Sequence, residues 1–264
     1  MYIQGTQSAL ATRMIYVRDL LRELVVRDIK LRYKRSVLGI TWAMITPLIQ
    51  ILIFTFLFNK VLPLNIPHYT EFVFCGVLSW TWFQSSLYLA AGSIVDNRDL
   101  VRRPGFPIAV LPVVTVATNM IHYILALPVL VVFLLRDGGT IGLVFLAIPV
   151  VMIVQFIFTL GLSYLIAAAH VLLRDTQHLL SVALTLLFYL TPVFYTIDRV
   201  PAKYLPIYQF NPMNHILQAY RDIIIAGQLP AAMPLLIVSV TSVLLLFVGY
   251  AIFRQTSDLF VEEL

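Results

Sequence analysis

The side chains best suited to a binding role in this sequence are aromatic rings inside two long apolar segments. Residues 72–95 contain Trp80, Trp82, Phe83 and Tyr88, and residues 176–197 contain Phe188, Tyr189, Phe194 and Tyr195 around Pro192. Rings of this size ordinarily pack between helices. The alternative is a pathway lined by rings, because the C–H faces of sugars stack on aromatic side chains and an uncharged lining does not trap a passing polymer.

A row of basic residues before the first apolar segment could bind an anion: Arg27, Lys30, Arg32, Lys34 and Arg35. Residues 15–34 are predicted to form an amphipathic helix, and its apolar face consists of Val17, Leu20, Leu21, Leu24 and Leu31. Such a helix lies in the membrane interface with its apolar face toward the lipid. It either serves as a lipid anchor only or also lines an access path for an anionic lipid-linked substrate, whose phosphates the basic row attracts.

Residues that carry catalysis or ion coupling are missing from the apolar segments. No Asp or Glu lies deep in any of them, whereas ion-coupled carriers use such groups inside the membrane. The five histidines show no metal-ligand spacing, and without a Gly-Lys pair the sequence has no Walker A phosphate loop. His122 and Asn119 share a helical face and are predicted to form interhelical hydrogen bonds. We therefore predict no catalytic residue, metal or cofactor in this chain.

The composition is that of an integral membrane protein. Of 264 residues, 60% are hydrophobic and 12% are charged, and the mean hydropathy is +0.91; soluble domains carry about 25% charged residues. The net charge of +5 follows from the excess of basic residues on cytoplasmic loops, so a nucleic-acid partner is not needed to explain it. Cys75 is the single cysteine, which allows no internal disulfide. The N-terminus shows no signal peptide.

The charge-free stretches predict an all-α protein with six transmembrane helices, because about 20 apolar residues cross the hydrocarbon core. The expected spans are about 37–60, 71–95, 107–135, 141–169, 178–197 and 231–253. Residues 1–35 form the cytoplasmic interface segment and residues 36–264 the membrane domain. Residues 204–220 are too short and polar to cross, and they are predicted to form a re-entrant helical hairpin between the fifth and sixth spans.

The distribution of basic residues predicts the orientation. With six spans, thirteen basic residues fall on the side of the termini and five on the other side. The positive-inside rule therefore places both termini in the cytoplasm. The cytoplasmic loops 96–107 and 170–178 are compact and charged, and Leu100 and Val101 suit a short helix pressed against a soluble partner.

Four segments of the sequence resemble one family of membrane proteins. Residues 27–58 begin with a basic amphipathic segment and continue with S-x-L-G-x-x-W and a proline; the matching positions are Ser36, Leu38, Gly39, Trp42 and Pro47. VLLRDTQH (171–178), LTPVFY (190–195) and FNPMNHILQAYRD (210–222) match as well. This set resembles the ATP-binding-cassette type-2 permeases that export O-antigen, capsule or wall teichoic acid.

The resemblance implies an arrangement that spacing alone does not show. It implies a homodimer with two copies of a separate ATPase, which binds the ATP and Mg²⁺. The ATPase contacts residues 15–34 and the loop 96–107, where the expected coupling residues are Asp96, Arg98, Asp99, Arg102 and Arg103. The polymer path lies between the protomers, lined by the first, second and fifth spans, so Trp42 joins the aromatic residues named above. Residues 198–229 form the outer gate.

We therefore predict a permease subunit, not an enzyme, that exports a polyprenyl-linked or similar glycan across the bacterial plasma membrane. One alternative is a type-2 permease for a drug, haem or ordinary lipid, which would carry fewer rings in mid-span. Another is a polytopic enzyme acting on polyprenyl lipids, against which the missing carboxylates and histidines argue. The sequence does not distinguish between the glycans or their lipid anchors.

Overall fold

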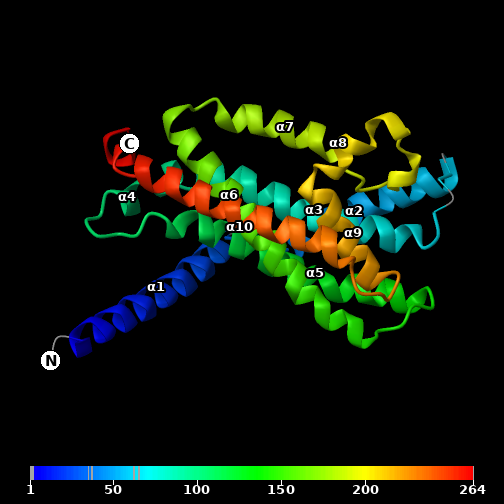
Figure 1. Ribbon diagram of the computed structural model, residues 1–264, viewed down its shortest axis with the longest axis horizontal. Coiled ribbons are helices and arrows are strands. Elements are labelled where there is room, and N and C mark those ends of the chain that lie inside the picture. Colours follow the sequence, from blue (N-terminus) through cyan, green and yellow to red (C-terminus); the bar gives the residue numbers. More distant parts are fainter. Residues whose placement is uncertain (1–2, 35, 37, 62, 65, 264) are drawn as a thin grey trace.

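The computed structural model describes residues 3–34, 36, 38–61, 63–64 and 66–263, and all regular structure in these residues is helical. The long helices form an elongated bundle, and α1 (Ile3–Arg32) extends away from it (Figure 1). The bundle consists of α2 (Trp42–Phe56), α3 (Tyr69–Gly92), α5 (Val110–Arg136), α6 (Ile148–Leu172), α7 (Thr176–Leu190) and α10 (Ala232–Thr256). Each predicted span overlaps one of these helices.

The connections alternate between the two ends of the bundle. The short helix α4 (Arg98–Val101), the turn from α6 to α7 and the C-terminal helix α11 (Leu259–Glu263) lie at one end (left in Figure 1). The turns that follow α2, α5 and α9 lie at the other end (right in Figure 1). Successive long helices therefore run in opposite directions along the bundle.

The helices differ in length and hydropathy, the two properties that decide whether a helix can cross a membrane. Three helical segments of the described chain are long and apolar enough to cross one: Val110–Arg136, Leu143–Leu172 and Ala232–Thr256. α2 and α7 are apolar but contain only 15 residues each, which covers about 22 Å of a hydrocarbon core of roughly 30 Å. A π-helical turn, Leu57–Val61, lengthens α2.

α3 is the central helix and is buried along most of its length. It packs against α2, α5, α6, α7 and α9. Because neighbouring helices shield it from lipid, α3 accommodates polar side chains: Ser79 and Ser86 are fully buried, and each donates a hydrogen bond to a carbonyl one turn earlier. Gln155 of α6 donates to the carbonyl of Ser79 at 2.8 Å. These hydrogen bonds satisfy polar groups that would be costly in a low-dielectric interior.

The N-terminal helix begins earlier and packs differently from the prediction. α1 starts at Ile3 rather than near residue 15. Leu24 is buried against Val110 and Val114 of α5, with Leu20 and Leu21 packed beside it, so α5 covers much of the predicted apolar face. Leu31, assigned to that face, is 55% exposed. Protein contacts, and not only lipid, therefore hold the C-terminal half of α1 in place.

The segment after α7 folds around a proline. The fifth span was predicted to continue through Pro192 to residue 197, but α7 ends at Leu190 and Pro192 lies in a non-helical loop. The residue before a proline is pushed out of the α region, and Thr191 is indeed extended with ψ 137°. Pro47, in contrast, lies inside its helix, α2.

Two helices follow this loop, α8 (Leu205–Gln209) and α9 (Pro212–Ile224). The side chain of Asn211 caps α9 by accepting a hydrogen bond from the amide of Met213 at 3.0 Å. α9 buries its apolar face against α3, α6 and α10. Arg221 on α9 is also buried; it donates to the carbonyl of Val193 at 2.7 Å and stacks 3.6 Å from the centre of the Phe72 ring. Through these two contacts, Arg221 connects the loop after α7 to α3.

Candidate functional site

A polar cavity of about 240 Å³ lies where the end of α1 meets α2, α3 and α5. The lining includes one of the predicted phosphate-binding residues, Arg32, and two of the predicted channel rings, Trp42 and Trp82. The remaining polar lining comes from Tyr33, Thr46, Thr81, Ser85, Asn119 and His122. One cation and several neutral hydrogen-bonding groups surround the space, an arrangement suited to a small anionic group.

Arg32 reaches into the bundle and connects α1 to α5. Its Nη1 donates to Oδ1 of Asn119 at 3.1 Å, and its Nη2 lies 3.3 Å from a carboxylate oxygen of Asp28. Its Nη1 also lies 3.4 Å from Nδ1 of His122. The sequence prediction that Asn119 and His122 form interhelical hydrogen bonds is confirmed, and their partner is the basic helix. The side chain of Arg32 keeps 26% exposure, so part of the guanidinium faces the cavity.

The contacts of His122 define which ring nitrogen carries the proton. An arginine can only donate, so Nδ1 of His122 accepts the hydrogen bond from Arg32. Nε2 then carries the proton and donates to the hydroxyl of Tyr33, which lies 3.3 Å away. Burial raises the pKa of the Tyr33 phenol, opposed by the charge of Arg32. Tyr33 therefore stays uncharged and Arg32 remains the one cation among the described lining residues.

The other members of the basic row lie on the outer surface of α1. Arg27, Lys30 and Lys34 are exposed, and Arg27 donates to Oδ1 of Asn97 at 2.6 Å. They border a broad, shallow groove along α1. Arg35 lies outside the described residues. The structure thus separates the predicted row into surface residues and a single inward-facing arginine, because successive residues of a helix point in different directions.

The predicted channel rings fall into two groups. Trp80, Trp82 and Phe83 are only 2–3% exposed and pack between helices of one protomer. This placement agrees with a packing role, and the proposal that these rings line a polymer pathway stays a prediction. Trp42, Tyr88 and Tyr189 are at least 43% exposed. Phe188 is buried, and Phe194 and Tyr195 are half-buried.

A cluster of stacked rings joins α2 to the loop after α7. The ring of Phe194 lies 5.4 Å from that of Phe54 and 5.5 Å from that of Phe58, both nearly parallel. Phe188 packs against the same cluster and against Trp80. Sequence analysis missed Phe54 and Phe58, although their spacing of four residues places both on one helical face. The cluster joins the C-terminal ends of α2 and α7.

Trp82 is buried and Tyr189 is exposed. We therefore expect their replacement by alanine to affect the stability of the fold to different extents. Trp82 donates from Nε1 to the carbonyl of Val116 at 3.3 Å, and its ring lies 5.2 Å from that of Tyr123. Trp82→Ala is expected to destabilise the fold by about 3–5 kcal/mol, because it leaves a large cavity. Tyr189→Ala should change monomer stability by less than about 0.5 kcal/mol. Thermal unfolding of both variants in detergent checks this; equal losses would contradict it.

The predicted ATPase-coupling residues form an exposed charged surface at the α4 end of the bundle. Asp96, Arg98, Asp99, Arg102 and Arg103 are all exposed. Val101, in contrast, is 3% exposed and packs with Ile94 and Leu111. The predicted short helix is confirmed as α4, and the hydrophobic effect places Val101 on its inner face; the contact of α4 with a soluble partner stays a prediction. Val101 anchors α4 so that the charged residues point outward.

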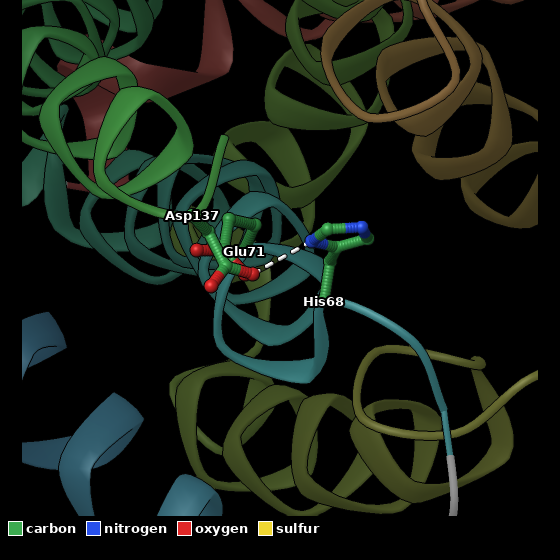
Figure 2. A group of neighbouring side chains, drawn as sticks. All are labelled: His68, Glu71 and Asp137. Atoms are coloured by element: carbon green, nitrogen blue, oxygen red, sulfur yellow. Dashed lines mark hydrogen bonds and ion pairs between the residues drawn. The ribbon is translucent and has the colours of Figure 1, made fainter. Parts of the chain in front are cut away.

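At the opposite end of the bundle, a histidine and two carboxylates come together. His68, Glu71 and Asp137 each offer a donor atom, and these atoms lie within 4.8 Å of one another (Figure 2). The sequence prediction of no metal-ligand spacing considered histidine spacing along the chain. It did not detect this group, because Asp137 is 69 residues from His68 and meets it only through helix packing.

The fold and the cavity are those of a helical membrane protein with an exposed charged surface at α4 and no catalytic constellation among its described residues. The chain matches the ABC-2 type transporter family over residues 19–225. It is 37% identical over 258 residues to the O-antigen export system permease protein RfbA of Myxococcus xanthus, covering 97% of this chain and 99% of that protein. The chain therefore belongs to the ABC-2 type transporter family.

Further relatives carry names of the same kind. An O-antigen export system permease protein RfbA of Klebsiella pneumoniae is 34% identical over 250 residues, 94% of this chain and 96% of that protein. The polysialic acid transport protein KpsM of Escherichia coli is 21% identical over 240 residues, 89% of this chain and 92% of that protein. These relatives are named permeases and transport proteins, which agrees with the prediction of a permease subunit and not an enzyme.

Proposed function

We propose that this chain is the transmembrane subunit of an ATP-driven exporter that moves a lipid-linked polysaccharide across the bacterial plasma membrane. The observation that carries the proposal is the similarity to an O-antigen export permease over 97% of this chain. The similarity includes the segments that form the cavity, the aromatic cluster and the α4 surface. Glycans of the O-antigen, capsule or teichoic-acid type are the substrate class.

In this proposal the chain crosses the membrane six times, with both termini in the cytoplasm and α8 and α9 forming a re-entrant hairpin. The alternation of connections between the two ends of the bundle supports it (Figure 1). So does the excess of basic residues on the side of α1 and α4. α9 contains 13 residues and spans only about 20 Å, which suits a helix that enters the membrane from one side and returns.

The chain works as a homodimer, and the polymer passes between the protomers. α2 and α7 support this, because both present exposed apolar residues along one side: Leu52, Phe56, Leu179, Leu186 and Tyr189 are each at least 59% exposed. A second protomer would cover these faces, and the stacked rings of Phe54, Phe188 and Phe194 lie behind them. The cavity with Arg32 would receive the lipid phosphate before the glycan enters the path.

A separate ATPase supplies the energy and binds the charged surface around α4. Replacing Arg102 and Arg103 with glutamate should lower substrate-coupled ATPase activity at least about tenfold, because like charges at an interface cost several kcal/mol. The complex would be assayed in proteoliposomes. Arg136→Glu, at an exposed position at the end of α5, is the matched control. If the double variant keeps its substrate-coupled ATPase activity, then Arg102 and Arg103 do not lie in the interface with the ATPase.

Export itself is tested in cells that lack this gene. Surface polysaccharide should disappear, lipid-linked polymer should accumulate inside, and the intact gene should restore both. Pull-down of the tagged chain from native membranes should recover a Walker A-bearing ATPase in near-equal amounts. Normal surface polysaccharide in the deletion strain, together with loss of drug, haem or lipid transport, would favour a different ABC-2 substrate.

A further inference from the structure

His68, Glu71 and Asp137 lie at the end of the bundle opposite α4 and come from two helices. His68 is the N-cap of α3 and adopts a left-handed backbone with φ 50°, a region in which histidine is enriched. Glu71 lies in the first turn of α3, and Asp137 follows the last residue of α5. All three side chains point toward one another in Figure 2. Helix termini therefore hold the three groups in place.

Glu71 is the member whose burial requires a partner. It is 3% exposed, its own backbone amide donates a hydrogen bond to the carboxylate, and no described lysine or arginine forms an ion pair with it. Arg136 borders the same cavity without such an ion pair. A buried carboxylate is costly unless a cation or hydrogen-bond donors compensate its charge. A cation held among these three side chains would therefore compensate the charge of Glu71.

The donor set specifies the kind of cation. Magnesium and calcium prefer ligands that are all oxygen, whereas one imidazole nitrogen with two carboxylates suits zinc and similar transition metals. Two carboxylates and a neutral imidazole carry a charge of about −2, which a divalent ion balances. His68 and Asp137 are both exposed, so an ion can reach the site from solvent, and the adjoining cavity of about 490 Å³ leaves room for a water ligand.

We propose that His68, Glu71 and Asp137 bind a divalent transition-metal ion of the zinc class. Nδ1 of His68 lies 2.6 Å from a carboxylate oxygen of Asp137. Tetrahedral zinc with bonds of about 2.0–2.1 Å places ligand atoms roughly 3.3 Å apart. Donor atoms within 4.8 Å of one another reach that spacing by side-chain rotation. The ion would tie the start of α3 to the end of α5.

The experiment uses the purified full-length chain in nanodiscs, stripped of metal and titrated with Zn²⁺ and separately with Co²⁺. Zn²⁺ at a hundredfold excess over its dissociation constant should raise the melting temperature by about 5–10 °C. Co²⁺ should produce visible d–d absorption with a stoichiometry of one per chain. His68→Gln, Glu71→Gln and Asp137→Asn should each abolish both signals. His178→Gln and Asp198→Asn, at exposed positions elsewhere, are the controls.

Two comparisons distinguish a metal site from a surface ion pair between His68 and Asp137. If Glu71→Gln fails to fold, the variants of the exposed ligands His68 and Asp137 carry the test, because their loss leaves no buried group unpaired. Equal Zn²⁺ effects in the wild type and in His68→Gln would overturn the proposal, and so would the absence of saturable binding. In that case His68 and Asp137 form only a surface ion pair, which the same variants would weaken with or without zinc.

Discussion

Replacing Arg32 with glutamine should reduce export by roughly tenfold to a hundredfold. Arg32 is the one described cation that lines the cavity between α1, α2, α3 and α5. A hydrogen bond to a charged group contributes about 1.5–3 kcal/mol, and each 1.4 kcal/mol corresponds to a factor of about ten. If a lipid phosphate binds beside Arg32, the loss appears as a higher substrate concentration for half-maximal ATPase stimulation in proteoliposomes.

Arg32 also joins α1 to α5 through Asn119 and His122, so stability must be measured together with transport. Arg32→Lys keeps the charge but loses the paired geometry, and it should recover part of the apparent affinity. Lys30→Gln removes an exposed charge from the same helix and is the matched control. If Arg32→Gln lowers the melting temperature but leaves the half-maximal concentration unchanged, then Arg32 only anchors α1.

Gly249→Ala should destabilise the protein by about 1–3 kcal/mol or more, the cost of overpacking a well-packed interior. A Cβ at Gly249 would collide with the carbonyl oxygen of Gly161. A Cβ at Gly161 would in turn lie 2.7 Å from the backbone nitrogen of Leu246. Backbone atoms cannot move aside as a flexible side chain can, so α6 and α10 would have to separate. Small residues permit such close packing of membrane helices.

Thermal unfolding in detergent, with the amount of folded protein recovered from membranes, measures this effect. Gly142→Ala is the control, because a Cβ there meets nothing within 4 Å and its φ of −106° is accessible to alanine. Gly142→Ala should therefore leave the melting temperature unchanged. If Gly249→Ala and Gly142→Ala behave alike, the contact between α6 and α10 is looser than the structure indicates.

The sequence by itself determined the class of the protein and the approximate positions of its helices. Long charge-free stretches identify buried or membrane helices, since a charge inside the membrane is expensive. The segment from Ser36 to Pro47, together with 190–195 and 210–222, was enough to identify the permease family. These inferences depend on local composition and on short motifs, which a single chain displays without reference to its fold.

The prediction of the fifth span was wrong at its end, and a local restriction on the backbone explains why. The charge-free stretch 176–197 predicted a fifth span through Pro192, but α7 ends at Leu190. Hydropathy does not detect this end, because Pro192 and Val193 are apolar. The restriction that a proline imposes on the preceding residue was the signal in the sequence that could have located it.

The tertiary structure decided which side chains meet. Arg32 faces the cavity whereas Lys30 and Lys34 face outward, and this difference in direction depends on the crossing of α1 and α5. Trp82 is buried because α5 covers it, although it lies in the same apolar helix as the exposed Tyr88. His68, Glu71 and Asp137 form one cluster because the ends of α3 and α5 coincide. Side-chain direction and helix packing depend on contacts between distant residues, which composition and short motifs do not encode.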